Sequence, residues 1–465
     1  MEKTALIIGA GLSGLSLAHG LSKAGWKVRV LESSDQVGGV IRSTKENGYL
    51  VEAACSSMMI KNAGVDALIH EIGLDGELCP SNPAANNRYI VRAGKLLAVP
   101  MSPLAFLRSS LWTIGGKLRL MREPFIAKRR ETSEESIESF VRRRVGDEFY
   151  NYAINPMVAG IYAGDPAKLA IKHAFTKVWA LEEKYGSLIK GTIGVIREGR
   201  RTGTKRYKSK LVSFKDGMQA LPNRLAELLG GAVVTSARIE QIQLNGSRVW
   251  QVSYYDPNNS QGRTECYSRL IITVPAHRLG SLPLPQPLAT QLQPLAEIPY
   301  APAATVALGF KRSAVAHALD GFGMLIPSHE GHRILGTLFQ STLFPGRAPE
   351  GHVLLTSFVG GALQPELVHN LDNTQRVSVV MEELRKLLGV REDPVYQSTT
   401  VWPRGIPQYN LGHDRFLNVM NAAETDWPLH LCANFRGGVG AGDCITNGLD
   451  LARRINEPEF DKSTR

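Results

Sequence analysis

The feature that most constrains the fold is a glycine-rich turn between a strand and a helix near the N-terminus. Residues 4–8 form a short apolar run, which is typical of a strand buried on both faces of a parallel sheet. A Gly-x-Gly-x-x-Gly turn follows at 9–14, and residues 15–24 have the apolar spacing of a helix. A second strand is expected at 27–32. Strand, helix and strand within about 30 residues predict a βαβ unit.

This turn is of the kind that holds the pyrophosphate of a dinucleotide. The first glycine permits the tight turn, the second lets the backbone approach a phosphate, and the third lets helix and strand pack closely. The helix N-terminus adds free N–H groups and the positive end of its dipole. At the end of the second strand, Glu32 can accept hydrogen bonds from ribose hydroxyls. The contacts expected here are Gly9, Ala10, Gly11, Leu12, Ser13, Gly14 and Glu32.

A second glycine-containing stretch favours FAD over NAD. Residues 38–42 read Gly-Gly-Val-Ile-Arg, and an extended run follows at 48–52. This stretch resembles the second glycine motif of the glutathione-reductase-type flavoproteins, in particular the flavin amine oxidase superfamily. Twin glycines let the backbone pass close to a pyrophosphate, and Arg42 can complement its charge. The alternative is a surface loop in which Arg42 pairs with a neighbouring acid.

Composition excludes several other classes of protein. The chain has 465 residues, of which 43% are hydrophobic and 21% charged, so wholesale disorder, collagen and coiled coil are excluded. At roughly 100–200 residues per domain, two or three domains are expected. Five scattered cysteines without a C-x-x-C motif argue against a disulfide framework or a zinc cage and favour a reducing, cytoplasmic location.

Neither a membrane span nor a metal site is expected. No apolar run reaches the roughly 18–20 residues that a spanning helix requires. Glu2 and the early glycines argue against a signal peptide at 5–21. The spacing of His329, His332 and His352 fits no standard metal site.

The chain changes character along its length. Helical patterns dominate from 96 to about 210, and residues 284–302 are rich in proline, which indicates a connector. An amphipathic helix is expected at 374–388. Strand-like runs occur at 232–234, 249–255, 270–274, 304–310, 323–327 and 352–359.

The helical stretch carries much of the formal charge of +11, with basic runs such as 142–144 and 197–210. Nucleic-acid binding is not expected, because the basic residues are not interleaved with stacking aromatics in a known module. Apolar residues at 104–114 lie close in sequence to Lys117, Arg119 and Arg122. This pairing favours contact with an anionic membrane surface, and a solvated helix face is the alternative.

Several later motifs follow one another along nearly the whole chain. Together they resemble those of the FAD-dependent protoporphyrinogen oxidases, a family that includes the related coproporphyrinogen III oxidases. The resemblance extends from about residue 4 to 453. Its motifs lie at 155–166, 185–188, 214–222, 321–327, 336–339, 344–345, 407–413 and 434–445.

The resemblance implies an α/β fold with three parts. These are a Rossmann-like FAD-binding domain of the glutathione-reductase/amine-oxidase type, a mixed-sheet substrate domain, and an inserted helical domain that contacts a membrane. The expected bounds are 1–80, 210–285 and 400–465 for the FAD-binding domain, 81–95 and 286–399 for the substrate domain, and 96–209 for the basic helical insertion.

The resemblance also implies non-covalent FAD and further contacts to it. The family usually has a Gly-Pro turn after the acid that corresponds to Glu52, whereas this chain has Ala54, Cys55, Ser56 and Ser57. We interpret Cys55 as a small packed side chain, with redox activity as the alternative. Besides this turn, the implied cofactor contacts are Ser33, Gly39, Val40, Arg42, Ile239, Trp402, Val439, Gly440 and Ala441.

Substrate contacts follow from the same resemblance. Arg88 would pair with a propionate, with Arg92 as a nearby competitor, and Gly160 and Gly164 would let the backbone close over one edge of the pocket. No catalytic triad or carboxylate pair is apparent, because the flavin carries the chemistry. The apolar residues expected to flank the macrocycle are Leu325, Leu338 and Phe339.

The implied function is the six-electron oxidation of protoporphyrinogen IX to protoporphyrin IX in haem biosynthesis, with dioxygen as acceptor and hydrogen peroxide as product. The alternatives are oxidation of coproporphyrinogen III to coproporphyrin III, another flavin oxidoreductase such as an amine oxidase or carotenoid desaturase, and a non-catalytic protein that hands porphyrin to the next enzyme. The implied partners are a porphyrinogen, dioxygen, an anionic membrane surface, a ferrochelatase-type downstream enzyme and a second copy in a homodimer. The protein is expected to bind the membrane peripherally.

Overall fold

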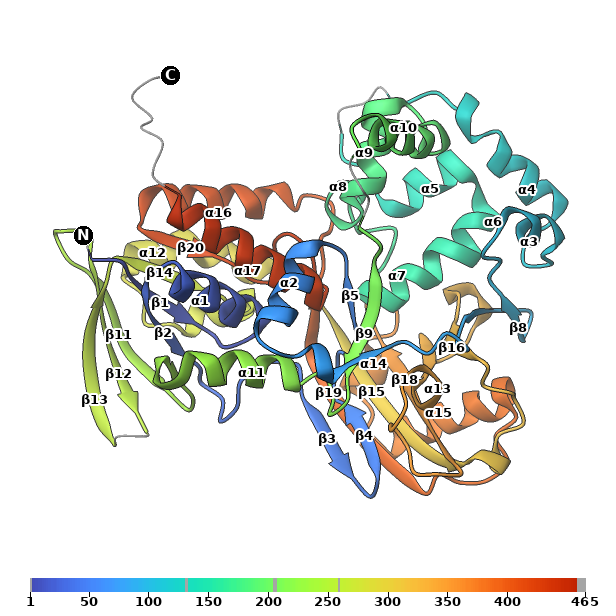
Figure 1. Cartoon of the computed structure of the whole chain (residues 1–465). Coiled ribbons are helices and arrows are strands. Elements are labelled where there is room, and N and C mark those ends of the chain that lie inside the picture. Colours follow the sequence, from blue (N-terminus) through green and yellow to red (C-terminus); the bar gives the residue numbers. More distant parts are fainter. Residues whose placement is uncertain (1, 130–132, 204–206, 258–259, 458–465) are drawn as a thin grey trace.

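The computed structural model describes residues 2–129, 133–203, 207–257 and 260–457. Figure 1 shows three groups of elements: a parallel sheet between helices, a larger mixed sheet, and a cluster of helices formed by residues 103–201. The α/β class expected from the sequence is confirmed.

The first group is a five-stranded sheet in the order β10-β2-β1-β14-β20, and all its strand pairs are parallel. Alternate residues of β1 enter opposite cores: Ile7 packs with α1, α11 and α17, whereas Leu6 packs with β12, α12 and α16. A strand buried on both faces was expected here, and it is confirmed. The strands are β1 (Thr4–Ile8), β2 (Lys27–Leu31), β10 (Val233–Val234), β14 (Arg269–Ile272) and β20 (Leu429–Leu431).

Helices and a three-stranded antiparallel sheet cover this parallel sheet. The helices are α1 (Leu12–Lys23), α2 (Ala63–Glu71), α11 (Ala220–Leu229), α12 (Gln286–Leu292), α16 (Asp414–Asp426) and α17 (Ala441–Asn456), and the covering strands are β11 (Arg238–Leu244), β12 (Trp250–Asp256) and β13 (Gln261–Tyr267).

The second group is a mixed seven-stranded sheet in the order β19-β15-β18-β17-β16-β7-β8. Only the pair β16–β7 is parallel. One face buries its apolar residues against α15 (Asn373–Leu388), which confirms the expected amphipathic helix. The strands are β7 (Asn87–Arg92), β8 (Lys95–Ala98), β15 (Tyr300–Lys311), β16 (Gly321–Leu325), β17 (Gly336–Phe339), β18 (His352–Gly360) and β19 (Tyr396–Pro407), with α13 (Gln340–Leu343) and α14 (Glu366–His369) beside them.

The third group, which we call the helical unit, has its own small core around Phe140, Val158 and Leu169. None of its helices, and no helix elsewhere in the described ranges, is long and apolar enough to cross a membrane. The elements are α3 (Pro103–Arg108), α4 (Ile114–Met121), the 3-10 turn η2 (Glu123–Phe125), α5 (Ile137–Val145), α6 (Asp147–Phe149), the π-helical turn η3 (Tyr150–Ile154), α7 (Asn155–Tyr162), α8 (Ile171–Ala174), α9 (Thr176–Tyr185) and α10 (Leu188–Arg201).

Two small sheets connect the groups. The hairpin of β3 (Ser43–Glu46) and β4 (Tyr49–Glu52) follows the second glycine stretch. The other sheet joins β5 (Met58–Ile60) and β6 (Leu78–Pro80) to β9 (Lys210–Phe214). After β6 the chain passes through β7 and β8 into the helical unit, and it returns from that unit at β9, next to β6. Short 3-10 turns complete the fold: η1 (Asp75–Glu77), η4 (Gly230–Ala232), η5 (Ala276–Ser281), η6 (Gln293–Glu297), η7 (Arg312–Ala314) and η8 (Ser328–Glu330).

The proline-rich connector expected at 284–302 is wrong. Residues 286–297 form α12 and η6, and Leu288, Leu292 and Leu295 are buried beneath the five-stranded sheet. Proline is tolerated in the first turn of a helix, where its missing N–H costs no hydrogen bond, so these prolines start helices. The segment therefore packs with the parallel sheet, and β19 extends the mixed sheet to residue 407. The bounds expected between the FAD-binding and substrate domains, at 285 and 400, therefore differ from the packing of α12, η6 and β19.

The basic run at 142–144 is not a free cationic surface. Arg144 is fully buried, and Arg143 hydrogen-bonds to Glu135 and Glu182 at 2.9–3.0 Å. Arg142 pairs with Glu138 at 2.7 Å. Arg144 holds the helical unit together, because its buried guanidinium requires carboxylate and carbonyl partners, whereas Arg142 pairs at the surface.

Candidate cofactor and substrate site

The first glycine turn has the geometry of a phosphate-binding loop. A Cβ on Gly14 would lie 2.1 Å from the carbonyl oxygen of Gly9, so only glycine lets α1 start this close to β1. A Cβ on Gly11, in contrast, would meet no protein atom within 4 Å. Among the described residues, no side chain caps the N-terminus of α1. The turn thus leaves space and free N–H groups where a pyrophosphate is expected.

The second glycine stretch lies directly against the first. The Gly38 N–H donates to the carbonyl of Ala10 at 2.8 Å, and a Cβ on Gly39 would have Gly11 Cα as its nearest neighbour, at 3.8 Å. Gly38 and Gly39 both have positive φ values, 106° and 63°. Val40 is exposed, and Arg42 is half-buried beside this turn. Two stretches almost 30 residues apart therefore meet at Gly11, as a shared phosphate site requires.

Glu32 is held rigidly at the end of β2. One carboxylate oxygen accepts the N–H of Ala10 and the other accepts the N–H of Ser34, both at 2.8 Å. The Ser33 hydroxyl lies 3.4 Å from the same carboxylate. The Ala237 N–H donates to the Glu32 carbonyl, which brings the start of β11 and Ile239 beside this end of the sheet. Oε2 accepts a single hydrogen bond from the described residues, that of the Ala10 N–H, so it keeps a second acceptor position that a ribose hydroxyl can use.

α17 packs against the first turns of α1. A Cβ on Gly448 would lie 2.6 Å from the Ser13 carbonyl oxygen, so the two helices are in close contact. Gly440 precedes α17, and no side chain caps this helix either. Val439 packs against the core of the helical unit. Gly440 and Ala441 thus present a second set of free N–H groups near the first, which suits an anionic or electron-rich part of a flavin.

The unusual turn at Ala54–Ser57 is fixed by the mixed sheet. Thr305 Oγ1 and Trp402 Nε1 both donate to the carbonyl of Ala53, at 2.9 and 3.1 Å. Ser56 is buried. The Cys55 thiol donates to the Ser57 carbonyl at 3.1 Å, and burial raises its pKa to about 12. A thiol with this pKa stays protonated at neutral pH, which supports the interpretation of Cys55 as a packed side chain.

One face of the seven-stranded sheet carries the expected substrate residues, and we call it the inner face. The strand register places Leu338 opposite Gly323 and Gly323 opposite Arg88 in one row. The next row on the same face, two residues along each strand, contains Leu325 and continues through β18 to Thr305. The Thr305 side chain, which donates to the Ala53 carbonyl, is therefore on the same face as Arg88.

Phe339 is placed differently from its prediction. Successive residues of a strand point to opposite faces, so Phe339 points away from Leu338. Its side chain is fully buried in the core against α15, together with Met324 and Leu355. The contact expected between Phe339 and a substrate on the inner face is therefore wrong, because the β17 alternation turns this ring into the core.

Arg88 and its competitor Arg92 have different surroundings. Arg92 pairs with Glu148 at 2.8 Å and lies over the Tyr152 ring at 4.3 Å. Arg88 is exposed, with its guanidinium 5.5 Å from the Phe322 ring centroid. Among the residues that the structure describes, no carboxylate pairs with Arg88. Its charge is thus available for a ligand, whereas that of Arg92 is already compensated.

Gly160 lies where α7 packs on the inner face. A Cβ on Gly160 would lie 3.0 Å from Leu325 Cδ2, and one on Gly164 would lie 2.5 Å from Gln408 Oε1. These glycines therefore allow the helical unit to approach the mixed sheet closely. The two residues Gly160 and Leu325 contact each other directly.

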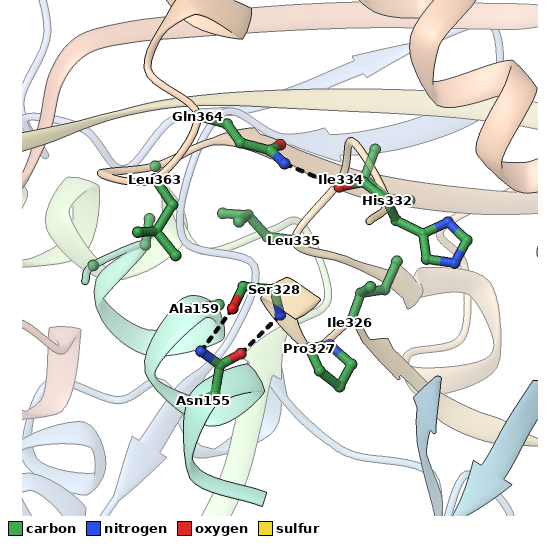
Figure 2. Close-up of a pocket in the computed structure, with 13 residues that line it drawn as sticks. Asn155, Ala159, Ile326, Pro327, Ser328, His332, Ile334, Leu335, Leu363 and Gln364 are labelled. Atoms are coloured by element: carbon green, nitrogen blue, oxygen red, sulfur yellow. Dashed lines mark hydrogen bonds between the residues drawn. The ribbon is translucent and has the colours of Figure 1, made fainter. Parts of the chain in front are cut away.

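Figure 2 shows a cavity at the same junction, between α7 and the loops that follow β16 and β18. The Asn155 side chain crosses it by two hydrogen bonds to Ser328, at 2.8 and 2.9 Å. The cavity encloses about 30 Å³, which suits one or two water molecules. Neither Arg88 nor Leu338 lines it, so it is a joint between the helical unit and the sheet.

Three residues that hold the site were not predicted from the sequence. Thr305 fixes the Ala53 turn, as described above. The Tyr409 hydroxyl accepts the Gly438 N–H at 2.9 Å and donates to the Asn434 carbonyl at 2.6 Å, so it shapes the loop before α17. Arg347 pairs with Glu52 at 3.1 Å, and both are buried. Tyr409 lies within the motif at 407–413, and Arg347 lies two residues after the motif at 344–345. These positions were the signal that could have identified both residues.

Comparisons with known proteins agree with this geometry. The sequence matches the family described as flavin containing amine oxidoreductase over residues 12–456. It is 33% identical over 477 residues to protoporphyrinogen oxidase 2, chloroplastic/mitochondrial, of Arabidopsis thaliana, covering 97% of this chain and 93% of the relative. Coproporphyrinogen III oxidase of Bacillus subtilis is 26% identical over 465 residues, covering 96% of each. A solved Exiguobacterium protein, provisionally described as a protoporphyrinogen oxidase, has a TM-score of 0.79 at 22% identity, covering 98% of this chain and 99% of its own.

Proposed function

Because the chain belongs to the family of flavin-containing amine oxidoreductases, we propose that it oxidises protoporphyrinogen IX to protoporphyrin IX, with dioxygen as electron acceptor and hydrogen peroxide as product. The protein is an oxidoreductase, and its cofactor is FAD. The relatives that share about a third of its sequence over nearly its whole length bear the name protoporphyrinogen oxidase. This supports a porphyrinogen as substrate.

The residues described above fit FAD. The two glycine turns, Glu32 and the free N–H groups of α1 and α17 would hold it, since no protein atom fills the space beside Gly11. When bound, FAD supplies a two-electron acceptor for a substrate methylene. Six electrons must leave the porphyrinogen, so the site has to present the same ring system three times. The protein's part is to bind and orient the macrocycle.

The observation that carries the substrate assignment is the charge on the inner face. Within the described strands, Arg88 is the only charged residue in the two rows that run from β7 to β19 through Leu338 and Leu325. Arg92, in the next row of β7, is already paired with Glu148. One guanidinium can hold one propionate in a bidentate pair, and the aliphatic side chains can contact the pyrroles. A single cation suits a substrate with two propionates better than coproporphyrinogen III, which has four.

An anaerobic assay tests the proposal. We expect the flavin absorbance of the purified protein to bleach when protoporphyrinogen IX is added without oxygen, and to return with hydrogen peroxide when air is admitted. We also expect a larger kcat/KM for protoporphyrinogen IX than for coproporphyrinogen III. A flavin that neither porphyrinogen bleaches would refute the proposal. Faster turnover of coproporphyrinogen III would replace the substrate and keep the reaction.

Arg88→Ala is expected to raise KM for the porphyrinogen roughly 10-fold or more with a smaller change in kcat. A charge-assisted hydrogen bond contributes about 1.5–3 kcal/mol, and each 1.4 kcal/mol is a factor of ten in affinity. Steady-state kinetics measure this effect. Arg385→Ala removes an exposed arginine from α15 and is the matched control. Equal KM values for both variants and the wild type would show that Arg88 does not contact the substrate.

We also propose that the α3–α4 surface contacts an anionic membrane. We define this surface as Met101, Leu104, Leu107, Ile114, Leu118, Met121 and Phe125, which are all exposed. Phe125 is 87% exposed and Ile114 77%, unusual values for large apolar side chains. The exposed Arg108 and Arg122 supply positive charge next to them. Leu111 and Trp112, also within the apolar stretch considered from the sequence, are instead buried against Phe106 of α3 and Phe149 of α6.

The variant Ile114→Ser/Phe125→Ser is expected to bind vesicles of anionic phospholipid at least 10-fold more weakly than the wild type. Burying one such side chain contributes about 1.5–3 kcal/mol, so losing two partly inserted ones exceeds a factor of ten. Vesicle co-sedimentation measures the difference. Leu228→Ser/Val395→Ser changes two exposed apolar residues outside this surface and is the control. Equal loss in both double variants would contradict the assignment.

A further inference from the structure

A cluster of three metal-ligating side chains lies outside the cofactor and substrate site. Glu134 precedes α5, His173 lies in α8, and Asp414 begins α16. One ligand atom from each lies within 4.8 Å of the other two. Figure 1 shows α8 beside an end of α16, where the helical unit meets the helices of the parallel sheet. We propose that these residues form a binding site for a divalent transition-metal ion, such as Zn²⁺, that ties the helical unit to α16.

The two distances from His173 suit a small ion, and the Glu134 and Asp414 oxygens lie within 4.8 Å of each other. His173 Nε2 lies 3.3 Å from Asp414 Oδ1 and 3.7 Å from Glu134 Oε1. Ligands about 2.0–2.2 Å from a tetrahedral zinc ion lie about 3.3–3.6 Å from one another. One imidazole and two carboxylates match the ligand preferences of zinc and manganese, and three protein ligands leave a position for water.

His173 Nε2 is the second observation that points to a ligand. This nitrogen is buried, and within the described ranges it has no hydrogen-bond partner, although it lies between two carboxylates. A buried polar atom without a hydrogen bond is costly, and coordination to a cation would satisfy it. The Asp414 side chain is 44% exposed, so an ion can reach the cluster from solvent.

The outer oxygen of each carboxylate is already held. Asp414 Oδ2 pairs with Lys172 Nζ at 2.6 Å, and Glu134 Oε2 accepts the N–H of Gly412. Each residue therefore keeps one oxygen directed at His173. In metal sites, hydrogen bonds to the other carboxylate oxygen commonly orient a ligand in this way. Lys172 offsets one of the two carboxylate charges, so the cluster keeps a net negative charge that attracts a cation.

The backbone positions the three ligands before any ion binds. The N–H of Ala170 donates to the Tyr409 carbonyl, and that of Leu411 donates to the Lys168 carbonyl, both at 2.8 Å. The Ile171 N–H donates to the Glu135 carbonyl at 3.0 Å. Three segments far apart in sequence are thus joined at the cluster, and little order has to be created on binding.

Titration calorimetry with ZnCl2 tests the proposal on the full-length, FAD-loaded, tag-free protein after removal of metals with a chelator. We expect one saturable zinc site per chain and a rise in melting temperature when it is filled. His173→Gln and Asp414→Asn should each bind zinc at least 10-fold more weakly and lose most of that rise. His70→Gln, which alters an exposed histidine beside Asp75, is the control and should bind as the wild type does.

Asp414→Asn guards against a variant that merely unfolds, because Asp414 is partly exposed and its metal-free melting temperature can be compared with that of the wild type. Absence of saturable zinc binding would overturn the proposal and leave an ion triad of His173 with two carboxylates. Zinc binding that both variants retain would place the ion elsewhere and also overturn it. Binding without a rise in melting temperature would refute the tie between the helical unit and α16.

Discussion

Gly11→Val is expected to produce a folded protein that does not retain FAD. Gly11 has an extended backbone with φ −74°, which valine adopts without strain, and no protein atom lies within 4 Å of its Cβ position. The added side chain would instead occupy the space expected for the pyrophosphate. We expect FAD affinity to fall more than 100-fold, measured by flavin fluorescence on titration of the apoprotein.

The control for this substitution is Gly262→Val, because Gly262 in β13 also has open space at its Cβ position. It should leave FAD affinity unchanged. Far-UV circular dichroism and the melting temperature of the apoprotein should be equal in both variants and the wild type. Normal FAD binding by Gly11→Val would mean that the pyrophosphate does not lie on this turn.

Arg144→Ala is expected to destabilise the helical unit by about 3–5 kcal/mol, the usual cost of leaving a buried charge without its partner. The fully buried guanidinium pairs with Glu123 and donates to the carbonyls of Ile126 and Gly186, both at 2.9 Å. Glu123 in turn accepts the N–H groups of Leu188 and Ile189 at the start of α10. One substitution thus affects α5, η2 and α10 together. Urea unfolding followed by circular dichroism measures the free energy.

Arg142→Ala is the matched control, since it removes an arginine two residues earlier in the same helix. The Arg142 side chain is 37% exposed and pairs with Glu138 and Asp147 at the surface. Such pairs contribute about 0–1 kcal/mol, so little change in the free energy of unfolding is expected. Equal destabilisation by both substitutions would show that burial of the Arg144 pair is not what stabilises the unit.

Local features of the sequence predicted the strand, glycine turn, helix and second strand that the structure has at the N-terminus. A strand, a glycine turn and a helix are contiguous, and their geometry follows from glycine conformation and apolar periodicity alone. The substrate half depended on a family resemblance, and it placed Phe339 wrongly. Sequence spacing alone does not reveal which face of β17 meets the helical unit, because that depends on the register of strands more than 200 residues apart.

The sequence also did not reveal which basic residues are buried. The basic residues of 142–144 have the same appearance in sequence as a membrane-facing cationic surface, yet their carboxylate partners lie up to about 40 residues away and enclose them. The prolines at 284–302 likewise did not predict α12. Its leucines are buried only because residues of the parallel sheet, distant in sequence, pack against them.

The sequence by itself determined a βαβ unit with a phosphate-binding turn, an FAD-dependent oxidoreductase family and the absence of long apolar spans among its segments. The tertiary structure decided which arginine is available to a substrate, which apolar residues are exposed on α3 and α4, and that Glu134, His173 and Asp414 meet. The physical reason is that turns and periodicity are local properties of the chain. Burial, charge pairing and ligand clusters arise only when distant segments are packed together.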